Sequence, residues 1–187
     1  MKAEISLLQA HRLLAPRPVC LLTVRYRGRE NVMTVAWVAP ISLDPPMVGV
    51  AVHPSRYTHD MLMRSQELVL SIPGRPLLEQ VMACGSVSGS DVDKISTYHL
   101  CCEDGRRVRA PWLSDCLAHL ECAVVTMLSP GDHSLFMAHV VGAWADEEAF
   151  SSAWRADVDE DLKPLVHLGG TLFGVMGRTV APNAQEN

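Results

Sequence analysis

The chain has 187 residues, of which 48% are hydrophobic, and carries a formal net charge of -5 at pH 7. This length and composition allow a substantial buried core and predict one domain over residues 1–187. A negative net charge argues against nucleic acid as the main partner, because a surface that follows phosphates is strongly basic. No apolar run approaches the ~18 residues that span a membrane, and the start of the chain does not resemble a signal peptide. The sequence therefore predicts a cytoplasmic protein that binds neither nucleic acid nor a membrane.

The secondary structure is predicted from hydrophobic periodicity and from the residues that end helices and strands. In chain order, the expected elements are a helix within 1–15, strands over 19–26, 32–38 and 47–52, a helix from about 57 to 65, a strand over 67–72, helices over 77–83 and 91–98, strands over 117–128 and 134–144, and one or two strands within 163–175. The acidic segment 146–161 is expected to be exposed and the tail 179–187 to be loose.

Proline and glycine predict where these strands bend. Proline cannot donate to a sheet ladder, so Pro40, Pro45 and Pro46 predict a corner or a sheet edge between the second and third strands. Gly169 and Gly170 predict a bend or a bulge near the end of the chain.

The expected elements predict a mainly β fold. Roughly seven strands, joined mostly by hairpins and interrupted by short helices, favour a closed β-barrel with helical insertions, because closure removes exposed strand edges. No G-x-G-x-x-G follows a strand, and strands do not alternate with long helices. A Rossmann domain is therefore not expected.

The stretch from Asn31 to Thr58 carries the clearest signal for a ligand. Its last strand breaks at Pro54 into Ser55-Arg56-Tyr57-Thr58, which predicts the start of a helix with a Ser or Thr N-cap. Unpaired backbone N–H groups and a guanidinium converge at such a start, and both bind anions. This turn is therefore a candidate phosphate site.

Short motifs then occur in a fixed order over residues 16–178. They are Pro18-Val19 before a strand, Asn31-Val32-Met33-Thr34-Val35-Ala36-Trp37, Ser42-Leu43-Asp44-Pro45-Pro46, Tyr57-Thr58, Gly85 with Ser88-Gly89 and Asp93-Lys94, Glu121-Cys122, Gly131-Asp132-His133, and Gly169-Gly170. This ordered set resembles the flavin reductase-like family of FMN-binding split-barrel proteins, which includes flavoredoxins and the reductase components of two-component monooxygenases. The resemblance implies a six-stranded antiparallel split barrel that forms a homodimer, with two flavins near the subunit interface.

The resemblance also implies which residues contact the cofactor, with FMN expected rather than FAD. The residues implied to bind it are Asn31, Met33, Thr34, Val35 and Trp37 beside the isoalloxazine ring, Ser55, Arg56, Tyr57 and Thr58 at the phosphate, Ser88 and Gly89 in the loop, and Lys94 as a second cation. His133 is implied to be the catalytic residue, on the nicotinamide or substrate side of the flavin. Family members carry an aromatic residue after the Asp-Lys pair, whereas this chain has Ile95 and no ring to stack there. Without the resemblance, Trp37 also reads as a core aromatic and Thr34 as an ordinary strand residue.

Two functions of different classes follow from this resemblance. The first is an FMN-dependent oxidoreductase that takes a hydride from NADH or NADPH and passes electrons to free flavin, a ferric complex or a partner monooxygenase. His133 would orient the nicotinamide or protonate the reduced flavin. The second is an FMN-binding electron carrier, store or sensor, because the sequence carries no nicotinamide-binding signature. A barrel that holds pyridoxal phosphate or haem fits the motifs less well.

The cysteines and histidines leave other readings open. Cys116, His119 and Cys122 invite a metal site, but residues three apart on a strand point to opposite faces and no C-x-x-C is present, so no metal is expected. The six cysteines are expected to be buried thiols, with Cys84 either a core residue or a reactive thiol. His53, at the end of a strand, is a second histidine expected to reach a ligand.

One basic cluster remains. Arg106, Arg107 and Arg109 lie beside Gly105 and are expected to decorate a solvated turn, with a binding role as the alternative.

Overall fold

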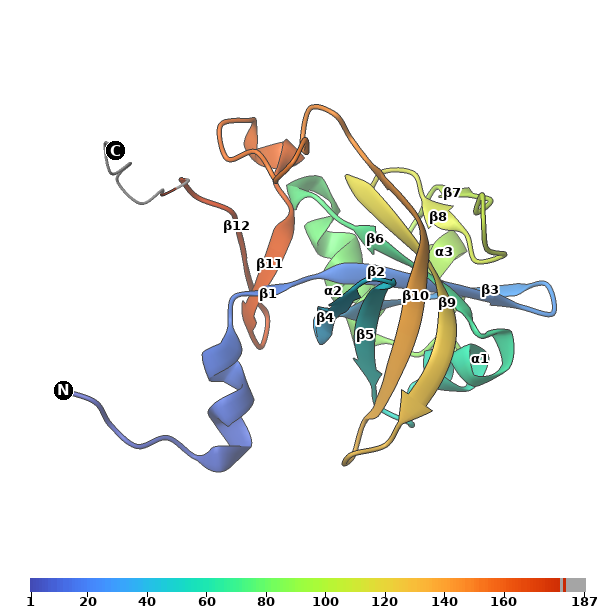
Figure 1. Ribbon diagram of the computed structural model, residues 1–187, viewed down its shortest axis with the longest axis horizontal. Helices are drawn as coiled ribbons and strands as arrows, with labels where there is room; N and C mark the ends of the chain where they lie inside the picture. Colours follow the sequence, from blue (N-terminus) through green and yellow to red (C-terminus); the bar gives the residue numbers. More distant parts are fainter. Residues whose placement is uncertain (179, 181–187) are drawn as a thin grey trace.

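The computed structural model describes residues 1–178 and residue 180. Its largest part is a seven-stranded antiparallel sheet with the strand order β3-β2-β6-β9-β10-β5-β4. The strands are β2 (Cys20–Tyr26), β3 (Arg29–Val35), β4 (Val38–Leu43), β5 (Pro46–Val52), β6 (Glu67–Ile72), β9 (Ala118–Leu128) and β10 (Ser134–Ala145). In Figure 1, β2 and β3 run across the view while β5, β9 and β10 run down it, so the sheet is strongly twisted and curls around its core.

The two hairpins expected around 27–30 and 129–133 are confirmed: β2 pairs with β3, with Cys20 opposite Val35, and β9 pairs with β10 along two long strands with two register shifts. A third hairpin, which was not predicted, pairs β4 with β5. The core of the sheet packs large apolar side chains such as Leu22, Val50 and Phe136, all fully buried. The apolar runs of the sequence therefore predicted where these strands lie.

One predicted strand is wrong. The run 32–38 does not continue through Trp37: β3 ends at Val35, and the chain then crosses to the opposite edge of the sheet as β4. The Trp37 carbonyl bonds to the Ala51 N–H of β5 at 3.0 Å. The main sheet therefore has seven strands instead of the expected six. Pro40 lies within β4, which is tolerated because β4 is an edge strand with one free side.

Short helices join the strands. They are α1 (Tyr57–Ser65), η2 (Arg75–Leu77), α2 (Leu78–Ser86), α3 (Lys94–Thr97) and η3 (Glu160–Leu162). Asp93 caps α3 through its side chain, as expected, accepting from the Ser96 N–H at 3.3 Å. The expected Ser or Thr N-cap of α1 is wrong: Arg56 holds the N-cap position, and no side chain caps it. Ser55 does not cap because its hydroxyl bonds to His53 Nδ1 at 2.8 Å.

The N-terminal segment and the strands near the end of the described chain lie outside the main sheet. The N-terminal helix is a 3₁₀ helix, η1 (Leu7–Leu14), with no buried residue, and Figure 1 shows it standing away from the sheet. A three-stranded sheet follows, formed by β1 (Arg17–Pro18), β11 (Leu165–Gly169) and β12 (Leu172–Val175). Gly169 and Gly170, both with positive φ, make the turn between β11 and β12, which confirms the expected bend. The tail expected to be loose lies outside the described residues except for Val180.

A small outer layer covers β6 and β9. The irregular region 101–115 contains two short paired strands, β7 (Cys102–Glu103) and β8 (Trp112–Leu113). The acidic segment 146–161 is mostly exposed, as expected, although Ala149 is buried. Within the described part of the chain, no helix has both the length and the apolar character needed to cross a bilayer.

Candidate functional site

A cavity of about 510 Å³ lies where β3 and the end of β5 meet the starts of α1 and α3 and the end of α2. The loop between β9 and β10 and the turn between β11 and β12 complete its wall. Of the residues predicted to form a site, the cavity brings together Met33, Thr34, Val35, Trp37, Ser55, Arg56, Tyr57, Thr58, Ser88, Gly89, Lys94 and His133. Asn31 is the predicted residue that does not line it.

One end of the cavity is rich in hydrogen-bond donors. Arg56 and the uncapped first turn of α1, with Tyr57 and Thr58, line this end. Lys94 also lines it although it is buried, and its Nζ donates to the carbonyls of Cys84 at 3.0 Å and Val87 at 3.3 Å. Burial lowers the pKa of Lys94, and the nearby guanidinium of Arg56 lowers it as well. Two cations placed close together favour an anion between them.

A buried contact joins this end to the sheet. Asn31 on β3 donates from Nδ2 to Thr58 Oγ1 at 2.7 Å. Gly89 lies against the same amide, and a Cβ atom there would collide with Asn31 Oδ1. The loop after α2 can therefore approach β3 only with glycine at this position.

The wall formed by β3 and α2 is held by Thr34. Its hydroxyl donates to the Val81 carbonyl at 2.5 Å, and its Cβ lies 3.4 Å from the position that a Cβ on Gly85 would occupy. The Thr34 side chain therefore anchors α2, and the polar groups that β3 can offer to a ligand are those of its backbone.

Aromatic and imidazole rings gather at another part of the cavity. The ring centroids of Trp37 and His133 are 4.6 Å apart, and those of His53 and His133 are 5.2 Å apart. His133 Nδ1 lies 2.8 Å from Asp132 Oδ1. Nδ1 therefore carries the proton and donates, which leaves Nε2 of the neutral ring as an acceptor. His53 also lines the cavity, as expected from its place at the end of a strand.

The sequence analysis missed several residues of the wall. His167, Gly170, Thr171 and Phe173 come from the β11–β12 hairpin, far along the chain from the other lining residues. The Gly169-Gly170 bend was the one local signal of this turn, and nothing in it indicated which part of the sheet the turn faces. Val81 and Met82 lie within the helix expected over 77–83, but the sequence did not show which face of that helix meets the cavity. Gly85 and Ser86 lie in its last turn, beyond the expected end of the helix, and Val87 follows directly.

Cys84 lines the cavity, but its thiol is protonated. Burial raises its pKa to about 11, although the Lys94 ammonium acts in the opposite direction. Nucleophilic cysteines react as thiolates. The structure therefore favours the interpretation of Cys84 as a small apolar residue of the wall.

The cysteines suspected of binding metal are separated in the fold. Cys122 belongs to the core cluster of the main sheet, whereas Cys116 belongs to the cluster that packs under α2. His119 Nδ1 lies 3.1 Å from Ser71 Oγ, and the ring stacks on Trp112. Among residues 1–178 and 180, no group of three or more His, Cys, Asp or Glu is placed to hold a metal ion. One expectation is wrong: Cys101 is exposed.

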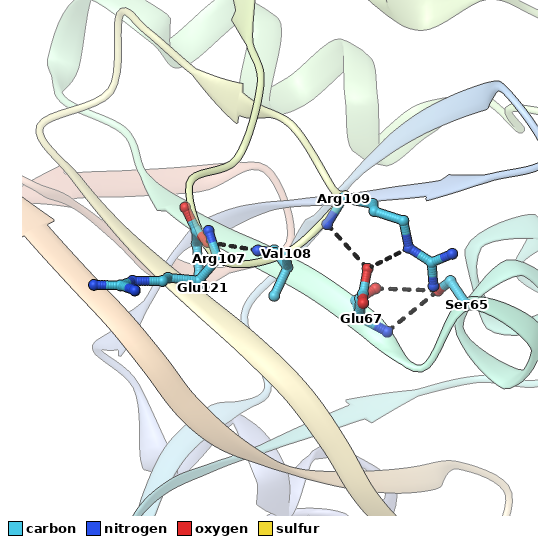
Figure 2. A network of polar contacts seen from close by, with 6 residues as sticks. All are labelled: Ser65, Glu67, Arg107, Val108, Arg109 and Glu121. Carbon is cyan, nitrogen blue, oxygen red and sulfur yellow. Dashed lines mark hydrogen bonds and ion pairs between the residues drawn. The ribbon is translucent and has the colours of Figure 1, made fainter.

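The arginine-rich turn forms a network of its own, centred on a fully buried carboxylate. Glu121 Oε1 accepts from the Arg106 N–H at 2.7 Å, and Oε2 accepts from the N–H groups of Arg107 at 2.5 Å and Val108 at 2.9 Å. Figure 2 shows this turn together with Glu67, which accepts from the N–H and the Nε of Arg109. These contacts favour the interpretation of the cluster as a structural turn.

The hydrogen bonds also set the charge state of Glu121. Burial alone would raise the pKa of this carboxyl, but the backbone N–H groups and Trp112 Nε1 that donate to it lower the pKa overall. Glu121 is therefore ionised while it holds the turn.

Comparison with known proteins relates this chain to flavin reductases. Residues 12–175 match the sequence model of the flavin reductase like domain. The uncharacterised protein YddH of Escherichia coli (strain K12) is 33% identical over 181 residues, which cover 94% of this chain and 95% of YddH. An NADH:riboflavin 5'-phosphate oxidoreductase of Streptomyces pristinaespiralis is 28% identical over 64% of this chain and 66% of its own length.

Solved structures agree with this likeness. An FMN-binding protein from Thermus thermophilus, with bound p-hydroxybenzaldehyde, is 26% identical with a TM-score of 0.85, over 97% of this chain and all of that one. Flavoredoxin from Methanosarcina acetivorans is 25% identical with a TM-score of 0.84, over 100% of this chain and 97% of that one. The fold is therefore the antiparallel split barrel of FMN-binding proteins, and the chain belongs to the flavin reductase-like family.

Proposed function

We propose that the chain binds FMN in the cavity and acts as an oxidoreductase that takes a hydride from NADH or NADPH. The observation that carries this proposal is the cavity itself, which gathers the residues implied by the family resemblance from five separate segments of the chain. A volume of about 510 Å³ lies within the range of cofactor sites.

The chemistry of the wall supports FMN as the ligand. The phosphate would lie at the donor-rich end, against Arg56, Lys94 and the start of α1. The isoalloxazine ring would lie along β3, where Val35 and neighbouring apolar side chains form a slot and the backbone offers hydrogen bonds to its polar edge. A single donor-rich end of the wall suits the terminal phosphate of FMN.

His133 is the residue we assign to the reaction. FMN, when bound, supplies the hydride and electron chemistry, and the protein supplies orientation and proton handling. With Nδ1 held by Asp132, the Nε2 atom of His133 is free to hold a proton or to orient the nicotinamide. Trp37 and His53 both pack against the His133 ring and limit its movement.

The partners that we propose are a second copy of the chain and an electron acceptor. The exposed apolar residues of η1 support self-association into a homodimer. The acceptor is free flavin, a ferric complex or a monooxygenase, as in a family that includes a 4-nitrophenol monooxygenase reductase component.

A second candidate function is an FMN-binding electron carrier or flavin store without NAD(P)H turnover. The likeness to Methanosarcina acetivorans flavoredoxin over the whole chain favours keeping it. Both candidates need the same cavity, so the two differ in what reduces the flavin.

An anaerobic titration separates them. The purified protein is loaded with FMN, its visible spectrum is recorded, and NADH or NADPH is added without oxygen. Bleaching of the flavin band is expected for the oxidoreductase. A band that persists, but bleaches with a reduced redox protein, would establish the carrier. Failure to take up FMN would contradict both functions.

A further inference from the structure

Asn31 lies directly behind the wall of the cavity. It belongs to β3 and is buried, with 4% of its surface exposed, but it does not line the cavity. Its side chain fills the space between Thr58, at the start of α1, and Gly89, in the loop after α2. Any effect of Asn31 on a bound ligand must therefore pass through these neighbours, and Thr58 and Gly89 both line the cavity.

The hydrogen bond between Asn31 and Thr58 has a direction. The Nδ2 atom of an amide only donates, so Thr58 Oγ1 accepts at 2.7 Å. A hydroxyl carries one proton, which is then available for a second bond. Within residues 1–178 and 180, the bond with Asn31 is the one that this hydroxyl makes. Thr58 is therefore held as a donor at the edge of the cavity.

The groups around Thr58 are donors too. Lys94 Nζ uses two of its three N–H bonds on the carbonyls of Cys84 and Val87. Arg56, two residues before Thr58 in the sequence, also lines the cavity. Among the described residues, neither cation forms an ion pair with a carboxylate. A set of donors and cations without an acceptor is complementary to a phosphate.

We propose that Asn31 is a positioning residue for phosphate recognition. By donating to Thr58 Oγ1, it forces the hydroxyl to present its proton to a phosphate oxygen in the cavity. The inference rests on the proposed function, in which the phosphate of FMN occupies this end. It replaces the expectation that Asn31 contacts the isoalloxazine ring, and it predicts that Asn31 matters for FMN and not for riboflavin, which lacks the phosphate.

Reversing the hydrogen bond tests this inference. In Asn31→Asp, the new carboxylate can only accept, so the Thr58 hydroxyl must donate to it and has no proton left for the phosphate. FMN and riboflavin are each titrated into the flavin-free full-length chain, with quenching of flavin fluorescence as the readout. The substitution is expected to weaken FMN binding about 10-fold or more and riboflavin binding less than about 2-fold.

The added negative charge would by itself repel a phosphate, and a second background separates the two effects. The same substitution is made in Thr58→Val, which has no hydroxyl to redirect. Asn31→Asp is expected to cost several-fold less FMN affinity in that background than in the wild type. Thr58→Ser retains the hydroxyl and is expected to keep the wild-type preference for FMN over riboflavin.

Each remaining result overturns the inference. An equal loss of FMN affinity in both backgrounds would show charge repulsion alone. A parallel loss of FMN and riboflavin would mean that Asn31 supports only the fold. Unchanged FMN binding in Asn31→Asp would contradict the direction assigned to the hydrogen bond. If the wild-type chain binds neither flavin, the proposed function fails together with the inference.

Discussion

The ring of His133 is held in one orientation by its neighbours in the cavity. It packs against Trp37 and His53, and its Nδ1 atom is bonded to Asp132 in the same loop. Side chains held on several sides lose little freedom when a ligand binds, which favours precise orientation. His133 is not among the residues proposed to bind the phosphate, because the donor-rich end is formed by Arg56 and Lys94. Binding and turnover can therefore be separated at this residue.

We expect His133→Gln to leave the dissociation constant of FMN within about 2-fold of the wild-type value while slowing reduction by NADH or NADPH about 100-fold, the scale of general acid–base catalysis. Fluorescence titration measures the first quantity, and anaerobic stopped-flow absorbance measures the second. His99→Gln is the control, since His99 is exposed and does not line the cavity. Reduction at the wild-type rate in His133→Gln would remove His133 from the reaction.

At the scale of elements, β9 buries polar side chains on one face because a loop covers it. His119 and Glu121 are two residues apart and so share that face. Trp112 of β8 stacks on His119 with ring centroids 4.5 Å apart, and its Nε1 donates to Glu121. Burial lowers the pKa of His119 to about 4. Protonation of His119 on β9 is therefore expected to make the stability of the folded chain depend on pH.

The sign of the pH effect follows from proton uptake. The unfolded chain binds a proton at His119 near pH 6.5, the ordinary value, whereas the folded chain binds it only near pH 4. Between these values the unfolded state holds more protons, so the free energy of unfolding falls as the pH falls from about 6.5 to about 4, by roughly 3 kcal/mol at most. Urea unfolding at pH 7 and pH 4.5 measures this loss. In His119→Phe, which keeps a ring against Trp112, the loss should be smaller by about that amount, and an identical loss in both proteins would contradict the assignment.

At the scale of the whole molecule, the N-terminal helix η1 exposes an unusual number of large apolar side chains. Leu7, Leu8, Leu13 and Leu14 of η1 are all more than 70% exposed. An open groove of about 520 Å³ lies between η1 and the sheet, with His11 and Leu14 on one side and Trp37 on the other. Trp37 also lines the flavin cavity, so whatever covers the groove lies next to the site. Apolar surface of this kind in a folded chain favours a protein partner.

We expect the chain to be a homodimer in solution, with a mass near twice 20.5 kDa. Leu14→Glu should shift it toward the monomer, because the charge would have to be buried in the interface. Sedimentation equilibrium measures the mass. Gln9→Glu introduces the same charge on the same segment at an exposed polar position and should remain dimeric. A monomeric wild type, or a dimer unaffected by Leu14→Glu, would contradict the proposed homodimer.

Local pattern was sufficient for most of the strands, and the family resemblance indicated part of the cavity wall. Runs of apolar and β-branched residues bounded by turn residues predicted β2, β6, β9 and β10 closely. The same pattern failed at Ala36-Trp37. Apolar residues continue there, and only pairing with β5 on the far edge decides that the chain has changed strands.

The sequence by itself determined the antiparallel β-rich architecture, the donor-rich turn around Arg56 and the place of His133 in a loop. The tertiary structure decided what each side chain does there. It placed the Asn31 side chain behind the cavity wall against Thr58, bound the Thr34 hydroxyl to the Val81 carbonyl within the wall, and brought the β11–β12 hairpin to the cavity. The physical reason is that periodicity records only which face of an element is buried, whereas hydrogen-bond direction and long-range contacts depend on which elements meet.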